Sequence, residues 1–352
     1  MSATIDTIPS VSTGGDPRVP PRYTKADFTS DQDVRWCPGC GDYAILAAMQ
    51  KLLSTLPVRR EDHVFISGIG CSSRFPYYVN TYGFHTIHGR APAIASGLKA
   101  ANPNLKVWVV TGDGDGLSIG GNHLIHALRR NFDLNILLFN NRIYGLTKGQ
   151  YSPTSELGKK TKSTPMGSLD YPFNPLSVAI GAAASFVARS MDVDAKHLGD
   201  TVLAAFNHKG TAFVEIFQNC NIFNDKAFVH FTEKEVRDDK QLRLEHGKKM
   251  LFAGGTKGIV RRDEKLAVAT LGVDGSLDDV LVHDAHDADP SKAFALAQLE
   301  SPAFPVAMGV LRAVERPTYE DMMTAQIAEA KKRKAPDLRK LMHAGYTWTV
   351  KG

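Results

Sequence analysis

A glycine- and aspartate-rich turn and a pair of asparagines are the first residues in this sequence that could carry out chemistry. The turn, 112–116, reads Gly-Asp-Gly-Asp-Gly and follows one apolar run, while Asn140-Asn141 follows a second one. Glycines let backbone N–H groups approach phosphate oxygens, but the carboxylate of Asp113 would repel a phosphate. A divalent cation with oxygen ligands, Mg²⁺ or Ca²⁺, would remove that conflict. If the two runs are neighbouring parallel strands, Asn141 can reach the same ion.

Four cysteines form the second group of chemically competent residues. Cys37 and Cys40 belong to a Cys-Pro-Gly-Cys segment, whereas Cys71 and Cys220 stand alone. In a reducing compartment these thiols are expected to be free of disulfides. Sets of four thiolates bind either zinc or an iron–sulfur cluster. Zinc sites usually combine two local pairs, and this chain has one pair and two distant single cysteines. The pattern therefore favours an iron–sulfur cluster and leaves structural zinc as the alternative.

Alternating strands and helices are expected to position these residues. Short β-branched or apolar runs predict strands, and apolar residues recurring every three or four positions predict helices. The expected strands are 63–67, 106–111, 134–139, 185–189 and 212–217, and the expected helices are 43–53 (with Asp42 as its cap), 91–101, 122–130, 195–207 and 233–250. This order predicts an α/β fold with a doubly wound, mostly parallel sheet.

The chain is expected to divide into three regions. Residues 1–22 are rich in Ser, Thr, Gly and Pro and are predicted to form a flexible leader, 23–250 the α/β domain, and 251–352 a C-terminal extension. Within the domain, segment 151–174 is long and polar and follows the end of a strand. Long segments of this kind inside a domain are usually functional, so we expect a lid over a site rather than a linker.

Composition and charge restrict the class of protein. Of the 352 residues, 43% are hydrophobic and 22% are charged, which is ordinary for a globular protein. The net charge of +5 is mild, and the basic pairs are dispersed along the chain, which argues against a nucleic-acid partner. We find neither the features of a secretory signal nor an apolar run long enough to cross a bilayer. A cytoplasmic protein without a membrane partner is therefore expected.

Both groups of residues resemble the motifs of one known family. Gly112-Asp113-Gly114 with Asn140-Asn141 is similar to the pattern by which thiamine-diphosphate-dependent enzymes bind their cofactor. Segments 36–41 and 70–74 and the isolated last cysteine are similar to the cluster-binding positions of the 2-oxoacid:ferredoxin oxidoreductase β subunit. The resemblance covers roughly residues 30–250. A dinucleotide site is disfavoured, because the glycine spacing does not match G-x-G-x-x-G.

The resemblance implies a set of cofactor and metal contacts. Mg²⁺ would be held by the side chains of Asp113 and Asn141 and by the backbone carbonyl of Ile143, and the four cysteines would hold one [4Fe–4S] cluster. For thiamine diphosphate, the implied contacts are Ile69, Gly70, Cys71, Ser72, His88, Gly89, Arg90, Ala91, Gly112, Gly114, Asp115, Gly145 and Leu146. Lys148 or Arg74 is the implied partner of a substrate carboxylate, because a dicarboxylate needs a cation for its distal group.

The resemblance also implies a reaction and partners. The chain would be the β subunit of a 2-oxoglutarate:ferredoxin oxidoreductase, which converts 2-oxoglutarate and coenzyme A to succinyl-CoA and CO₂ and passes electrons through the cluster to ferredoxin, reversibly. Thiamine enzymes need a glutamate from a second domain to activate the cofactor, and we find no such domain in this sequence. An α subunit is therefore expected as a partner, in an α2β2 assembly, and the chain alone is expected to be inactive.

Three other interpretations of the sequence remain open. The same reaction could use pyruvate or branched-chain 2-oxoacids in place of 2-oxoglutarate. A thiamine-dependent decarboxylase or synthase without redox chemistry would share the magnesium motif but would have no need of the cysteines. A zinc-containing assembly factor would share the cysteines but would have no need of Asp113 and Asn141.

Overall fold

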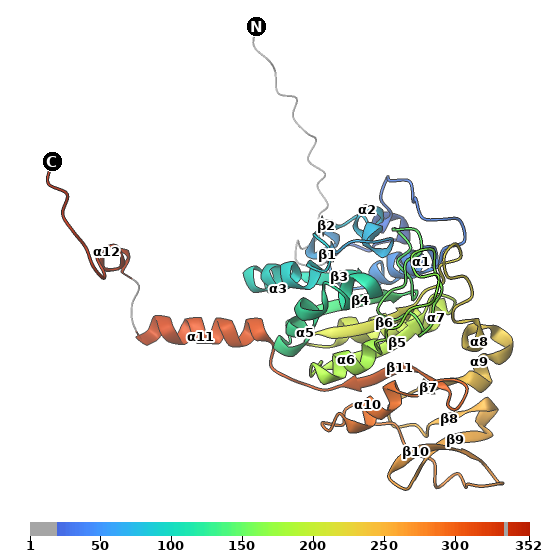
Figure 1. Ribbon diagram of the computed structural model, residues 1–352. Helices are drawn as coiled ribbons and strands as arrows, with labels where there is room; N and C mark the ends of the chain where they lie inside the picture. The colour runs from blue at the N-terminus through green and yellow to red at the C-terminus, as the bar shows by residue number, and fades with distance from the viewer. Residues whose placement is uncertain (1–19, 334–336) are drawn as a thin grey trace.

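The computed structural model describes residues 20–333 and 337–352, so most of the predicted leader lies outside the described residues. The strands of the main sheet are β1 (His63–Ser67), β2 (Tyr82–His85), β3 (Lys106–Gly112), β4 (Leu134–Asn140), β5 (Phe186–Met191), β6 (Ala212–Phe217), β7 (Gln241–Leu244) and β11 (Val306–Ala313). They form an eight-stranded sheet in the order β2-β1-β3-β4-β6-β5-β11-β7 (Figure 1). Every neighbouring pair is parallel except β11 and β5. The predicted mostly parallel α/β sheet is confirmed.

Helices cover both faces of this sheet. The helices that do so are α1 (Asp42–Leu53), α3 (Ala91–Ala101), α5 (Gly121–Arg130), α6 (Pro175–Gly181), α7 (Ala195–Asn207) and α10 (Ser291–Ala297). Residues of α3, α5, α6 and α10 share one hydrophobic core with one face of the sheet, and residues of α1 and α7 share a second core with the other face. Alternate residues of β3 enter the two cores, Val107 and Val109 the first, Trp108 and Val110 the second. Burial on both faces explains why these strands read as continuous apolar runs.

Shorter helices occupy the connections between these elements. They are α2 (Phe75–Tyr78), α4 (Asp113–Leu117), α8 (Val229–Thr232), α9 (Lys234–Lys240) and α12 (Leu338–Met342), with 3₁₀ turns at Lys25–Phe28, Arg60–Asp62, Ser72–Arg74 and Ala253–Gly255. Segment 151–174 contains neither helix nor strand, as expected for a functional loop. Asp42 is the first residue of α1 rather than its cap, because Gly41 occupies the N-cap position.

Two expectations for the second half of the chain need correction. The single helix predicted over 233–250 is wrong, because α9 ends at Lys240 and the strand β7 follows immediately. Parallel pairing with β11 buries Gln241, Leu242 and Leu244, and this tertiary contact outweighs the local helical pattern. The predicted boundary at residue 250 cuts through the main sheet, because β11, which belongs to the expected extension, is one of its strands. Before β11, an antiparallel sheet is formed by β8 (Leu251–Phe252), β9 (Lys257–Arg262) and β10 (Lys265–Thr270).

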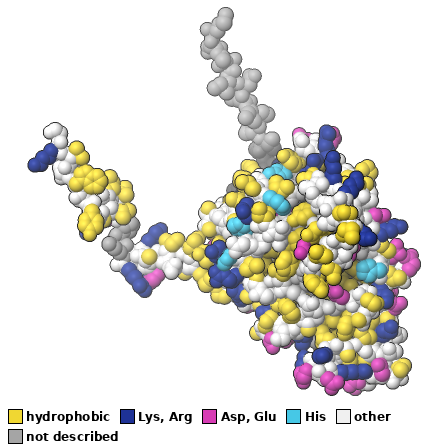
Figure 2. Space-filling model, viewed as in Figure 1, with side chains coloured by type: hydrophobic (Ala, Val, Ile, Leu, Met, Phe, Trp, Pro, Cys, Tyr) yellow, Lys and Arg dark blue, Asp and Glu magenta, His cyan; other side chains and the backbone are white. Residues whose placement is uncertain are grey.

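The helix α11 (Tyr319–Arg333) extends away from the body of the protein (Figures 1 and 2). Its first residue packs on Phe132, with ring centroids 4.7 Å apart, and Glu320 accepts a hydrogen bond from the backbone of Asp133. Both contacts lie at the amino end of β4, opposite the end where Asn140-Asn141 follows. Within the described residues, no helix is long and apolar enough to cross a membrane.

Candidate cofactor and metal site

A cavity of about 130 Å³ lies at the carboxyl ends of β1, β3 and β4. Parallel strands bring the residues that follow them to one edge of the sheet, which is where open α/β sheets bind ligands. Asp113, Asn141 and Ile143 all line this cavity, as do all the predicted thiamine contacts except three. The exceptions are Gly89, Arg90 and Ala91.

The glycine-rich turn is packed so closely that only glycine fits at its centre. A Cβ atom on Gly114 would collide with the ring of Tyr144, whose hydroxyl donates to the Gly114 carbonyl at 3.0 Å. The glycines of the turn therefore bring its backbone to the cavity between the residues Asp113 and Asp115. Backbone N–H groups at such a turn fit the requirements of a diphosphate.

Asp113 is a buried carboxylate at the edge of the cavity, with 2% of its surface exposed. Its Oδ2 accepts hydrogen bonds from Ser152 at 2.5 Å and from Thr154 at 2.6 Å. Burial raises the pKa of Asp113 to about 6, and the two hydrogen bonds oppose that shift. Among the described residues, no Lys or Arg forms an ion pair with Asp113. A buried carboxylate without a cationic partner fits a divalent metal ion.

The two asparagines after β4 have different surroundings. Asn140 is buried and donates through Nδ2 to Glu215 at 2.7 Å, and Glu215 in turn accepts from Arg189 at 2.7 Å. Asn141 lines the cavity, and its Oδ1 accepts from the backbone N–H of Ile143 at 3.1 Å. The first asparagine is therefore an anchor within the sheet, and the second presents an oxygen-bearing amide at the cavity.

Asp115 joins three loops that follow three different strands. Its Oδ1 accepts from the backbone N–H groups of Ile69 at 3.0 Å and Gly89 at 2.7 Å, and it lies 2.6 Å from Nδ1 of His88. Its Oδ2 accepts from Thr111 at 2.6 Å. Asp115 therefore lines the cavity and also binds the loops that follow β1 and β2. These hydrogen bonds hold the two loops in place around the cavity.

The substitution Asp115→Asn is expected to lower the free energy of unfolding by about 3 kcal/mol, because the amide cannot accept from all the donors around it. Urea unfolding of the cofactor-free protein measures this effect. The control is Asp170→Asn, since Asp170 is an exposed carboxylate bonded to Tyr151 at 2.8 Å. Equal unfolding midpoints for the two variants would contradict the role of Asp115 in joining the loops.

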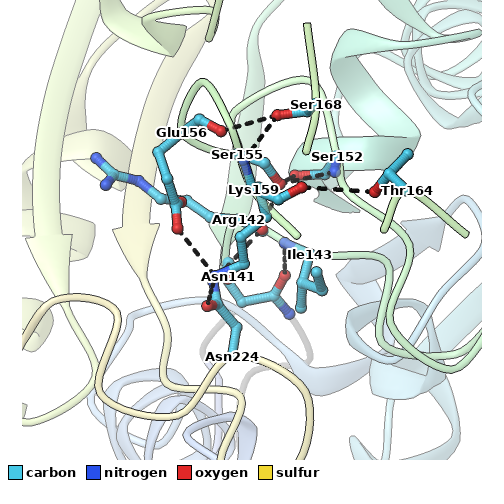
Figure 3. Close-up of polar contacts among 10 residues, drawn as sticks. All are labelled: Asn141, Arg142, Ile143, Ser152, Ser155, Glu156, Lys159, Thr164, Ser168 and Asn224. Carbon is cyan, nitrogen blue, oxygen red and sulfur yellow. Dashed lines mark hydrogen bonds and ion pairs between the residues drawn. The ribbon is translucent and has the colours of Figure 1, made fainter. Parts of the chain in front are cut away.

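The loop 151–174 is attached to the turn after β4 by a series of polar contacts (Figure 3). Ser155 donates to the carbonyl of Arg142 at 2.6 Å, and Lys159 donates to Asn224 at 2.6 Å. Asn224 also donates to the carbonyl of Asn141 at 2.9 Å. Ser152 and Thr154 of the same loop contact Asp113 directly, so the loop is bonded to one predicted side-chain ligand of the magnesium ion and is linked to the other, Asn141, through Asn224.

All four cysteines line a second cavity, of about 210 Å³. Cys37 is exposed and Cys220 is buried, so the cavity extends from the surface to the end of β6. A Cβ atom on Gly145 would lie 3.5 Å from the Cys71 sulfur and 3.6 Å from the Cys220 sulfur. Because residue 145 is glycine, no side chain stands beside these two sulfurs at this position. Within residues 20–333 and 337–352, no three His, Cys, Asp or Glu side chains are arranged around a single metal ion. Four thiols around one cavity are ligands of the kind that hold zinc or an iron–sulfur cluster.

The surroundings of the thiols also favour a cationic occupant. Burial and the carboxylate of Asp42 raise the pKa of the Cys40 thiol well above its usual range. Burial and the same carboxylate raise the pKa of Cys71 to about 12, against the smaller effect of Arg74. Thiolates in this cavity therefore need positive charge beside them, which iron ions would provide.

The two cavities share a wall. Cys71, Asn141, Gly145, Leu146 and Gln218 line both of them. Sequence reasoning did not include Gln218, although it is a polar residue directly after β6 and two positions before Cys220. It also missed the loop hydroxyls that contact Asp113.

Lys148 and Arg74 line the cysteine cavity and not the cavity beside Asp113. Lys148 has a positive φ of 71°, in the turn that follows Gly145. Arg35 lines the same cavity. The structure therefore places both predicted substrate residues next to the thiols.

Comparisons with known proteins agree with this geometry. The family model described as "Thiamine pyrophosphate enzyme, C-terminal TPP binding domain" matches residues 68–216. The chain is similar to the 2-oxoglutarate oxidoreductase subunit KorB of Mycobacterium tuberculosis, with 56% identity over 330 residues, 92% of this chain and 88% of the relative. It is also similar to the 2-oxoacid:ferredoxin oxidoreductase 1 subunit beta of Aeropyrum pernix, with 50% identity over 57% of this chain and 63% of the relative.

A solved structure extends the similarity to the fold of the whole chain. The 2-oxoglutarate:ferredoxin oxidoreductase of Magnetococcus marinus, with 2-oxoglutarate, coenzyme A and succinyl-CoA bound, has a chain that superimposes with a TM-score of 0.73 at 31% identity. The match covers 93% of this chain and 98% of that one. The similarity is therefore wider than the residues that carry the cysteine and glycine motifs.

Proposed function

Because the chain belongs to the β subunits of the thiamine-pyrophosphate-dependent 2-oxoacid:ferredoxin oxidoreductases, we propose that it forms half of a 2-oxoglutarate:ferredoxin oxidoreductase. The reaction converts 2-oxoglutarate and coenzyme A to succinyl-CoA and CO₂, and two electrons leave for ferredoxin. The observation that supports this best is a pair of cavities with a common wall, one beside Asp113 and Asn141 and the other lined by four cysteines.

The residues around the first cavity fit thiamine diphosphate with a magnesium ion. The side chains of Asp113 and Asn141 and the carbonyl of Ile143 would hold the ion, and the backbone of 112–116 would face the diphosphate. Thiamine diphosphate supplies the carbon nucleophile and electron sink that 2-oxoacid decarboxylation requires. The protein's part is to neutralise the diphosphate, to fix it at the sheet edge and to exclude water with the loop 151–174.

The four cysteines fit one [4Fe–4S] cluster, held by Cys37, Cys40, Cys71 and Cys220. Such a cluster accepts and releases single electrons at low potential. Cys71 lines both cavities, so one of the proposed ligands touches the thiamine side directly. Cys37 is exposed, so the cysteine cavity reaches the surface of the protein. The positive charge of Arg35, which lines the same cavity, would attract an acidic ferredoxin.

Completion of the thiamine cavity by an α subunit is supported by its size and its rim. Its volume of about 130 Å³ is well below the roughly 300–1,000 Å³ of sites that enclose a ligand. Among the described residues, no glutamate lines it. At the neighbouring sheet edge, Tyr82, Phe84 and Ile87 are 66%, 51% and 77% exposed. A partner surface that covers these side chains would close the cavity and supply the missing carboxylate.

Preference for 2-oxoglutarate is proposed to depend on Arg74 and Lys148. Both line the cysteine cavity close to the shared wall, where either could pair with the distal carboxylate of a dicarboxylic oxoacid. Pyruvate and branched-chain oxoacids lack this carboxylate and would leave the cations without a partner. The similarity to proteins named for 2-oxoglutarate in Mycobacterium tuberculosis and Magnetococcus marinus supports the same preference.

The test is an assay of the chain co-produced with its α subunit under anaerobic conditions. We expect the complex to reduce ferredoxin with coenzyme A and 2-oxoglutarate at least about tenfold faster than with pyruvate or 2-oxoisovalerate, because a lost ion pair costs about 1.4 kcal/mol or more. Either subunit alone is expected to give no turnover. Full turnover by this chain alone would contradict the divided site, and a preference for pyruvate would contradict the substrate.

A further inference from the structure

Gln218 is a buried amide in the wall between the two cavities, with 1% of its surface exposed. It directly follows β6, and its backbone N–H donates to the carbonyl of Asn140 at 2.9 Å. The side chain is therefore held at the end of β6 next to the end of β4, which carries Asn141.

The oxygen of the Gln218 amide contacts the magnesium side of the wall. Oε1 accepts a hydrogen bond from Nδ2 of Asn141 at 2.9 Å. Asn141 Oδ1 meanwhile accepts from the N–H of Ile143, so both ends of the Asn141 amide have defined partners. If the Asn141 amide were rotated by 180°, its oxygen would face the Gln218 oxygen, and its NH₂ group would face the N–H of Ile143. Gln218 and the Ile143 N–H therefore together orient the Asn141 amide and fix the position of the oxygen that a metal can bind.

The nitrogen of the same amide contacts the sulfur side of the wall. Nε2 lies 3.2 Å from the sulfur of Cys40 and 2.6 Å from the carbonyl of Asn219. Its two hydrogens therefore have two acceptors, of which one is a proposed cluster ligand. An N–H group directed at a ligand sulfur stabilises the added electron of a reduced cluster and raises its reduction potential.

We propose that Gln218 is a positioning residue that acts on both cofactor sites at once: it orients Asn141 for the magnesium ion of thiamine diphosphate, and it raises the reduction potential of the cluster through Cys40. This inference rests on the function proposed above and deepens it. The geometry that supports it is the continuous chain Asn141–Gln218–Cys40 across the shared wall. Through these two hydrogen bonds, Gln218 would act both on the thiamine diphosphate site, which donates electrons, and on the cluster, which accepts them.

Two substitutions in the α2β2 complex separate the two contacts. In Gln218→Met the side chain keeps its length but loses both, so we expect a more negative cluster midpoint potential and about 10–100-fold weaker binding of magnesium thiamine diphosphate. Gln218→Glu, at pH 8, keeps an acceptor for Asn141 and loses the donor for Cys40. In that variant the potential is expected to be more negative, while the cofactor affinity stays within about threefold of wild type.

Redox titration followed by electron paramagnetic resonance measures the potential, and calorimetry with magnesium and thiamine diphosphate measures the affinity. The matched control is Gln241→Met, because Gln241 is also buried and its Nε2 lies 3.3 Å from a sulfur, that of Met191, outside both cavities. A merely structural role for Gln218 would lower the unfolding midpoint of its variants without shifting the potential.

The possible outcomes distinguish this inference from the proposed function. A wild-type complex without iron or without thiamine diphosphate binding overturns both. A wild-type complex with both groups, and a potential and affinity unchanged in Gln218→Met, overturns the inference alone. If Gln218→Met does not fold, Gln218→Glu decides, since an unchanged potential in that variant contradicts the contact with Cys40.

Discussion

Replacement of Asp113 by asparagine is expected to weaken the binding of magnesium thiamine diphosphate by at least about 100-fold, because it removes the negative charge from the proposed metal site. The free energy of unfolding of the cofactor-free protein should not fall in the same variant. The carboxylate of Asp113 is buried, and within the described residues it has no Lys or Arg partner, so its removal relieves a cost. Loss of affinity without loss of stability separates a metal ligand from a structural carboxylate.

Calorimetry on the complex with the α subunit, with and without EDTA, measures this affinity. The matched control is Asp133→Asn, which removes a carboxylate at the amino end of β4, where Asp133 pairs with Lys99 at 3.0 Å. That variant should bind the cofactor normally and unfold more easily. If Asp113→Asn bound thiamine diphosphate as tightly as wild type, or if EDTA left binding unchanged, the proposed metal site would be wrong.

Serine in place of any one of the four cysteines is expected to remove most of the iron and acid-labile sulfide from anaerobically purified protein. The broad visible absorption of the cluster should disappear with them, and ferredoxin reduction should be lost. A cluster with only three thiolates in a cavity open at Cys37 has little protection from solvent and oxygen. Binding of thiamine diphosphate should persist in Cys37→Ser, because this cysteine does not line the first cavity.

The control for the cysteine variants is Ser73→Ala. Ser73 is a buried residue in the same loop as Cys71, and its hydroxyl oxygen has no hydrogen-bond partner among the described residues. This variant should keep its iron. Zinc in place of iron in the wild-type protein would contradict the proposed cluster, as would a cysteine variant that keeps a full complement of iron and sulfide.

Much of the fold was predictable because the sheet is buried on both faces. The predicted bounds of β1, α3, α7 and β6 match the structure, since each segment is a short apolar or periodic run that ends at a glycine or a polar residue. Prediction failed where distant contacts decide the structure. The strand β7 exists because β11, some sixty residues later in the chain, pairs with it, and the local sequence carries no sign of that pairing.

The candidate site was predictable to the extent that its residues form local motifs. Cys37 and Cys40, or Gly112 and Asp113, are close in sequence, and their spacing identifies them. The loop hydroxyl of Thr154 and the amide of Gln218 carry no such spacing, because they reach the site from separate segments through the tertiary fold. The resemblance assigned Asp115 to the cofactor, and in the structure Asp115 lines the cavity while its oxygens also accept hydrogen bonds from Ile69, Gly89 and Thr111, which the sequence did not indicate.

The strand β4 is buried along its whole length and is paired on both sides, with β3 and with β6. Its backbone amides should therefore be among the last in the protein to exchange with deuterium, since their exchange requires the sheet itself to open. Asn140, at its carboxyl end, belongs to this slow unit, whereas β2 at the sheet edge and the protruding α11 should exchange early. On heating, β2 and α11 should therefore unfold before β4, whose carboxyl end carries Asn140.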